Sequence, residues 1–94
     1  MPIAPVTLGN RVCVSQGAYL CTGNHNFRSP DFEQRLEPIQ VGDDVWIAAR
    51  AVLAPGTVVG AGAVIAMAAV ASGTVPPGAL LRGNPAVAVA VAQR

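Results

Sequence analysis

The sequence predicts an all-β solenoid in which short parallel strands wind into stacked triangular coils, a parallel β-helix. Three observations support this prediction: large aliphatic residues recur at every sixth position, small residues follow them, and the composition suits narrow strands with frequent corners. Of the 94 residues, 52% are hydrophobic but only 4% are aromatic, and the chain contains 10 glycines and 8 prolines. Apolar mass made largely of alanine and valine favours tightly stacked strands, and so many glycines and prolines favour frequent turns.

The period of six is clearest in the middle of the chain. Stepping by six gives mostly large aliphatic residues: Val41, Ile47, Leu53, Val59, Ile65 and Ala71. The residue after each is small: Gly42, Ala48, Ala54, Gly60, Ala66 and Ser72. The fourth residue after each is small or β-branched: Val45, Ala51, Thr57, Ala63, Ala69 and Val75. If three hexapeptides complete one coil, aliphatic residues eighteen apart stack on each other and bury a continuous core.

An N-terminal group of repeats obeys the same rule in another register, with Leu8, Val14 and Leu20 at intervals of six. The interval from Leu20 to Val41 is 21 residues, which is not a multiple of six. A segment at about 24–40 therefore separates the coils at 2–23 from those at 41–76. It holds five of the eleven charged residues, both phenylalanines and the only histidine. This break in composition predicts an extruded loop, and long loops in compact domains are usually functional or disordered.

The C-terminal region begins with turn signals. Val75-Pro76-Pro77-Gly78 and Arg82-Gly83-Asn84-Pro85 are expected to end the solenoid and to open a tail at 77–94. Alanine and valine alternate through 86–92, which suits either a strand or a short helix. We expect one domain, residues 1–94, whose modest core favours oligomerisation.

Charge and cysteine content limit the partners and the compartment. The net charge of +1 argues against nucleic acid as a partner. Residues 51–81 carry no charge, but their prolines, glycines and period of six disfavour insertion into a membrane. Two cysteines and no visible signal peptide predict a cytoplasmic protein with reduced thiols. A single histidine disfavours the three-histidine zinc site of a γ-class carbonic anhydrase, so no metal is expected.

Four stretches together resemble one known family: residues 16–25, 41–49, 53–60 and 75–86. They are similar to the hexapeptide-repeat acetyltransferases, above all to those ascribed to colanic-acid biosynthesis, relatives of maltose and galactoside acetyltransferases. The loop histidine, Trp-Ile after Gly-Asp-Asp, and the Pro-Pro…Gly-Asn-Pro ending are the most specific features. The resemblance implies a left-handed β-helix and a homotrimer with active sites between subunits. It also implies a chain that matches the C-terminal half of such a protein.

The same resemblance implies an activity, which is transfer of an acetyl group from acetyl-CoA to a hydroxyl of a sugar or related small acceptor, in polysaccharide biosynthesis. His25 would be the general base that removes the proton of the acceptor hydroxyl, while backbone N–H groups stabilise the oxyanion. Asn24 is a candidate for acceptor binding. The positions that line the CoA channel in relatives are Trp46, Ala49, Met67 and Ser72. Arg82 is a candidate partner for the CoA phosphates, because the usual basic residue after Asn-Pro-Ala is Val87 here.

Some features depart from the family pattern or fit a second interpretation. Gly73-Thr74 replaces the usual Lys-Asp pair, and Ala48, Ala66 and Ala68 replace glycines, which adds methyl groups where the cofactor approaches. Trp46 could anchor a subunit interface, Asn24 could fill a coil corner, and His25 could be a solvated loop residue. Cys21 could be a nucleophile, although its corner position favours packing. The alternative to an enzyme is a catalytically silent trimeric β-helix with a structural role.

Overall fold

The structure is a computed structural model that describes residues 4–25, 28–31 and 33–92. These residues form strands and turns only, so the all-β prediction is confirmed, and no helix in this part of the chain could span a membrane. The strands are β1 Val6–Leu8, β2 Cys13–Val14, β3 Tyr19–Leu20, β4 Gly23–His25, β5 Gln34–Leu36, β6 Ile39–Val41, β7 Trp46–Ile47, β8 Val52–Leu53, β9 Val58–Val59, β10 Val64–Ile65, β11 Val70–Ala71, β12 Thr74–Val75, β13 Ala79–Gly83 and β14 Ala86–Val91.

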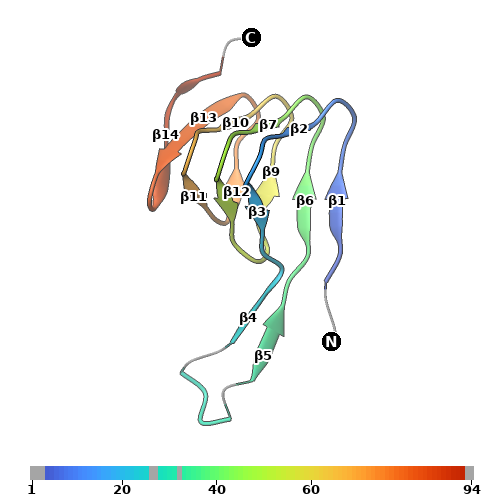
Figure 1. Ribbon diagram of the computed structural model, residues 1–94, viewed down its shortest axis with the longest axis vertical. Coiled ribbons are helices and arrows are strands. Elements are labelled where there is room, and N and C mark those ends of the chain that lie inside the picture. Colours follow the sequence, from blue (N-terminus) through green and yellow to red (C-terminus); the bar gives the residue numbers. More distant parts are fainter. Residues whose placement is uncertain (1–3, 26–27, 32, 93–94) are drawn as a thin grey trace.

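Three sheets form the three faces of the solenoid. Their strand orders are β1-β6-β9-β12, β2-β7-β10-β13-β14 and β3-β8-β11. Consecutive strands of a coil belong to different sheets, while strands of neighbouring coils pair in parallel within one sheet. Figure 1 shows the resulting coils side by side, with β1 at one end and the β13–β14 pair at the other.

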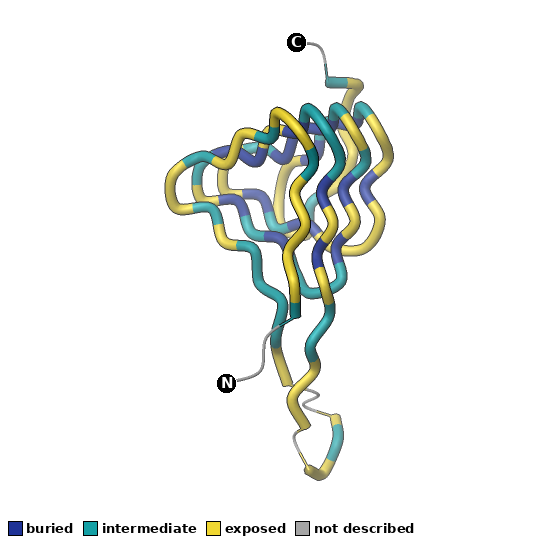
Figure 2. The backbone as a smooth tube through the Cα atoms, turned by 90° about the vertical axis from the view of Figure 1, so that its right-hand side faces the viewer, coloured by how far each residue is buried: buried dark blue, intermediate teal, exposed yellow. Residues whose placement is uncertain are grey.

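The core follows the predicted register. Ile47 and Ile65 are directly paired, and Val14 lies opposite Ile47 on the other side. The fourth-position residues Val45, Ala51, Thr57, Ala63 and Ala69 are also fully buried. Figure 2 shows buried segments of the backbone recurring along successive coils. Leu8 and Val14 remain 46% and 43% exposed, because β1 and β2 are edge strands of their sheets.

The inserted segment is a β-hairpin that is shorter than the loop predicted at 24–40. Strands β4 and β5 pair antiparallel, and the Glu37 N–H donates to the Thr22 carbonyl oxygen at the base of the hairpin, 2.9 Å away. The coils resume at Ile39, which is 0% exposed and lies opposite Val6. The coils thus resume two residues before the end of the segment expected at about 24–40, because 39–40 already belong to the parallel sheet. Both phenylalanines of the predicted loop, at 27 and 32, lie outside the described residues.

The solenoid also continues past its predicted end. Val75 comes only four positions after Ala71 instead of six, and Gly73 turns the chain with a φ of 68°. Val75 therefore stacks on Val59 as an inward aliphatic residue. The sequence had predicted Val75 at the fourth position of its repeat. Strand β13 then pairs with β10, so Pro-Pro-Gly forms a corner that leads into a further coil and does not end the solenoid. The tail forms strand β14, which folds back antiparallel on β13.

The corners stack in columns with the same left-handed backbone. One column consists of Arg11, Asp44, Gly62 and Gly78, with φ between 57° and 75°. Arg11 and Asp44 form an ion pair across this column at 2.7 Å, and this contact raises the pKa of Arg11. Neighbouring corners approach closely, because a Cβ at Gly60 would lie 2.5 Å from the backbone nitrogen of Pro77. Glycine is required there by contact between coils.

Candidate functional site

A groove of about 370 Å³ runs along the corner that follows β2, β7 and β10. Its lining consists of Ser15, Trp46, Ala48, Ala49, Val64, Ala66, Met67 and Leu80. Ser15, Ala48 and Ala66 each follow the inward aliphatic residue of one coil, so they form a column along the solenoid axis. The short side chains of this column leave the space that the groove occupies.

Three of the predicted cofactor positions meet in this groove. Trp46 points outward from β7 and is 42% exposed, and its indole Nε1–H donates to the Ser15 Oγ at 2.9 Å. Ala49 and Met67 lie at the same corner in successive coils, and the Ala68 N–H donates to the Ala49 carbonyl oxygen at 3.0 Å. The structure thus gathers residues that are far apart in the sequence onto one surface.

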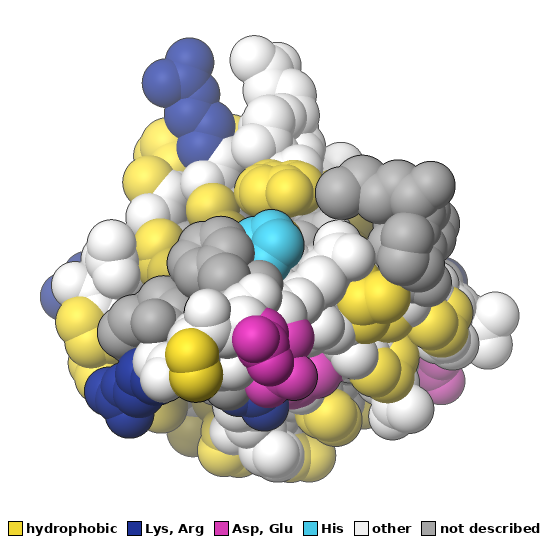
Figure 3. Space-filling model, turned by 90° about the horizontal axis from the view of Figure 1, so that it is seen from below, with side chains coloured by type: hydrophobic (Ala, Val, Ile, Leu, Met, Phe, Trp, Pro, Cys, Tyr) yellow, Lys and Arg dark blue, Asp and Glu magenta, His cyan; other side chains and the backbone are white. Residues whose placement is uncertain are grey.

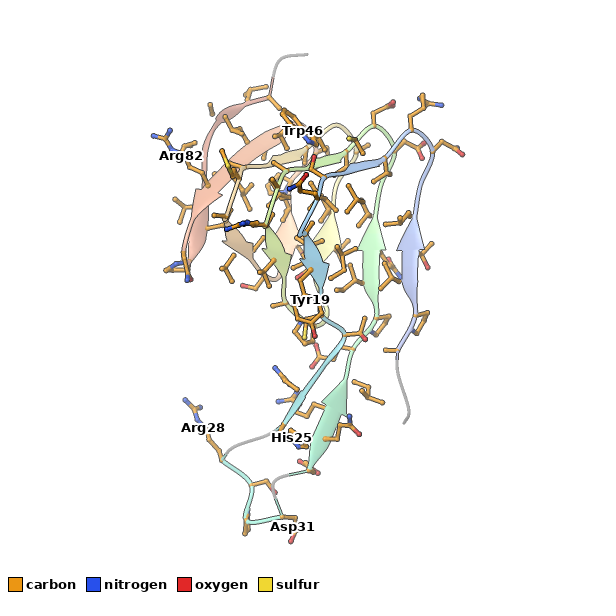
Figure 4. The ribbon with its side chains drawn as sticks, in the orientation of Figure 1. Tyr19, His25, Arg28, Asp31, Trp46 and Arg82 are labelled. Carbon is orange, nitrogen blue, oxygen red and sulfur yellow. The ribbon has the colours of Figure 1, made fainter. Side chains whose placement is uncertain are left out.

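The other two predicted cofactor residues lie outside the lining. Arg82 follows Leu81, which pairs with Ile65, so Arg82 extends the Ser15–Ala48–Ala66 column by one coil. It is exposed, and Figure 4 shows its side chain projecting from the β13 end of the solenoid. Ser72 follows β11 at a different corner, and its role stays a prediction.

His25 lies away from the groove within one chain. It is the last residue of β4, is exposed, and lies opposite Gln34 on the projecting hairpin. Figure 4 shows Trp46 on the solenoid and His25 well along the hairpin, with Tyr19 between them. Figure 3 shows the histidine at the surface of the hairpin end of the molecule. Asn24 is also exposed, but successive strand residues point to opposite faces, so the two side chains face opposite sides of the hairpin.

The base of the hairpin contains Cys21 and Tyr19. The Cys21 thiol donates to the Gly23 carbonyl oxygen at 3.1 Å, and a hydrogen bond with Cys21 raises the pKa of Tyr19. The thiol is therefore engaged by its neighbours where the chain leaves the coil, which favours a structural role over nucleophilic chemistry. In the described ranges, no three acidic, histidine or cysteine side chains are grouped to hold a metal ion.

Sequence reasoning did not single out Ser15, Val64 or Leu80 as groove residues. Val64 lies eighteen residues after Trp46 and pairs with it, so the period alone could have identified it. The period does not identify Ser15, because the hairpin changes the spacing between the first two coils. It does not identify Leu80 either, because the shortened corner at Gly73 changes the spacing before β13. Ser15 follows Val14, which pairs with Ile47, and Leu80 pairs with Val64, so both places are found only when strands are paired in space.

The chain is similar to known transferases. Residues 38–73 match the family described as bacterial transferase hexapeptide (six repeats). Over 87 residues, the chain is 34% identical to WcaF of Escherichia coli, whose name assigns it an acetyltransferase role in colanic acid biosynthesis. This match covers 93% of the chain and 48% of WcaF. A chloramphenicol acetyltransferase of Escherichia coli is 39% identical over 62 residues, which are 66% of the chain and 30% of that enzyme.

Solved structures of similar proteins have the same fold. The hexapeptide-repeat acetyltransferase VCA0836 of Vibrio cholerae, complexed with acetyl-CoA, superposes with a TM-score of 0.87 at 30% identity, covering 97% of this chain and 51% of that one. A galactoside acetyltransferase in complex with coenzyme A gives 0.86 at 26% identity, with coverages of 92% and 44%. The chain thus spans about half the length of these relatives. It carries the bacterial transferase hexapeptide repeat and has the left-handed β-helix fold of the hexapeptide-repeat acetyltransferases.

Proposed function

We propose that the chain transfers the acetyl group of acetyl-CoA to a hydroxyl of a sugar or related small acceptor, in the cytoplasm and in polysaccharide biosynthesis. The observation that carries the proposal is the groove, which contains Trp46, Ala49 and Met67 on one corner. Structures at 30% and 26% identity are complexes with acetyl-CoA and coenzyme A. A pantetheine arm is narrow and flexible, so a groove floored by alanines suits it, and Arg82 one coil further on suits a phosphate.

The proposed chemistry requires two subunits. Because His25 and the groove lie apart in one chain, the hairpin of one copy would reach the groove of its neighbour. There His25 accepts the proton of the acceptor hydroxyl while the hydroxyl oxygen attacks the thioester carbonyl. The carbon–sulfur bond then breaks, the acetyl ester forms, and the leaving CoA thiolate takes the proton from His25, which gives the free CoA thiol and a neutral imidazole.

Binding of acetyl-CoA tests the groove directly. Trp46 is the only tryptophan, so we expect acetyl-CoA to quench its fluorescence and to raise the melting temperature with ligand concentration. Arg82→Ala should weaken binding by about tenfold, as expected when a hydrogen bond to a charged group is lost. Arg11→Ala is the matched control, because it removes an arginine at another corner and should leave the affinity unchanged.

Absence of both signals at millimolar acetyl-CoA would contradict the proposed activity. That outcome would favour a catalytically silent β-helix with a structural role. Quenching that is equally weakened by Arg11→Ala and Arg82→Ala would show that the phosphates are bound without a specific contribution from Arg82.

We expect the protein to be a homotrimer that packs flat coil faces together. Residues 51–94 carry only two charges, Arg82 and Arg94, and the outward side chains of Val58, Val87 and Val89 are exposed in the single chain. So apolar a surface favours association. Light scattering should give three times the 9.5 kDa mass of the chain, and a stable monomer at micromolar concentration would contradict the trimer.

A further inference from the structure

We infer that Ser15 is a positioning residue, which holds the Trp46 indole in place and so keeps the groove open for acetyl-CoA. This inference rests on the function proposed above and adds a residue to it. Ser15 belongs to the first coil and Trp46 to the second, so the hydrogen bond between them joins two neighbouring coils in the lining of the groove.

The backbone of Ser15 is fixed on both sides. Its N–H donates to the Ile47 carbonyl oxygen at 2.8 Å, and its carbonyl oxygen accepts from the Ala18 N–H at 3.3 Å. The hydroxyl is therefore attached to a rigid part of the ladder. From there its Oγ accepts from the Trp46 Nε1–H at 2.9 Å, a normal length for a hydrogen bond.

In the groove, Ser15 is the only side chain with an oxygen that can accept a hydrogen bond from the Trp46 indole N–H. The remaining lining residues are Ala48, Ala49, Val64, Ala66, Met67 and Leu80, and none carries a nitrogen or oxygen in its side chain. Trp46 is also the largest side chain of the lining, and it is 42% exposed. Without the Ser15 acceptor, we expect the indole to adopt further rotamers, some of which would cover Ala48 and Ala66.

The bond also determines what the groove presents to a ligand. With its N–H satisfied by Ser15, the indole offers an apolar face. That face suits the methylene segments of a pantetheine arm, while the amides of the arm pair with the backbone of the coils.

The test replaces Ser15 with alanine and with threonine. In Ser15→Ala without ligand, we expect Trp46 emission to move to longer wavelength and the indole N–H proton to exchange faster with solvent. The dissociation constant of acetyl-CoA should rise by about 5- to 30-fold, as for one lost hydrogen bond plus the ordering of a side chain. The kcat should change less than twofold, and Ser15→Thr, which keeps the hydroxyl, should restore the affinity.

Trp46→Phe supplies the matched background, because phenylalanine has no N–H to hold. There, Ser15→Ala should have no further effect on acetyl-CoA binding. An equal loss in both backgrounds would overturn the inference, since Ser15 would then act independently of the indole. If the unmodified protein binds acetyl-CoA and Ser15→Ala binds it equally well, only the Ser15 inference fails. If the unmodified protein does not bind it, the proposed function itself fails.

Discussion

Replacing His25 with alanine is expected to lower acetyl transfer by about 10² to 10⁴, the range for loss of a general base. His25 is the only imidazole of the chain, so no second histidine can replace it. Acetyl-CoA binding should be nearly unchanged, because the proposed role of His25 concerns the acceptor hydroxyl and not the groove. Steady-state transfer to a sugar acceptor measures the first quantity, and Trp46 quenching measures the second.

Gln34→Ala is the control for the hairpin, since Gln34 is the cross-strand partner of His25. It should keep turnover within a few-fold of the unmodified protein. An alanine variant of His25 with full turnover would contradict the catalytic role, as would a variant that lost only acetyl-CoA affinity.

Mixed oligomers can test whether His25 acts across subunits. A His25→Ala chain keeps an intact groove, and an Ala66→Phe chain fills its groove but keeps its histidine. If base and groove come from different copies, co-refolding the two inactive variants should restore part of the activity. If both come from the same copy, no mixture regains it.

Ile65→Asp is expected to prevent cooperative folding. Ile65 is 0% exposed and lies in the middle of a stack, with Ile47 on one side and Leu81 on the other. An unpaired carboxylate at this position costs several kcal/mol, which is comparable to the whole stability of a small domain. Circular dichroism during heating should show no cooperative transition.

Two control variants accompany Ile65→Asp. Thr74→Asp places the same group on an exposed outward position of β12 and should melt like the unmodified protein. Ile65→Val shortens the buried side chain by one methylene and should cost about 0.5–1.5 kcal/mol. A soluble Ile65→Asp protein that melts cooperatively would mean that this position does not face the core.

The core was predictable because stacking imposes a repeat that the sequence must display. Ile47 and Ile65 contact each other through that repeat, and no other knowledge is needed to pair them. The misplaced end of the solenoid comes from treating the period as strictly constant. A coil requires only that the next strand pairs with the coil before it. The corner at Gly73 is two residues shorter than the others, and Val75 still pairs with Val59.

The candidate site was less accessible to sequence reasoning. Trp46, Ala49 and Met67 were predicted from the resemblance, and Val64 could have been predicted from the period, because it comes eighteen residues after Trp46. Ser15 could not be found from the period, because the hairpin inserted between the first two coils changes their spacing. The sequence alone does not show which residues lie next to one another along a corner of the solenoid. The separation of His25 from the groove is likewise a property of three-dimensional arrangement.

The hairpin leaves the first coil and returns to the second without disturbing either. Leu8 still stacks on Val41 and Leu20 on Leu53, as they would if the chain passed directly from one coil to the next. Since loop closure becomes only slowly less favourable with length, this excursion can lengthen, shorten or change sequence at little expense to the fold. The hairpin can therefore change while the coils stay constant, so the acceptor contact that we propose for it could be altered without redesigning the fold.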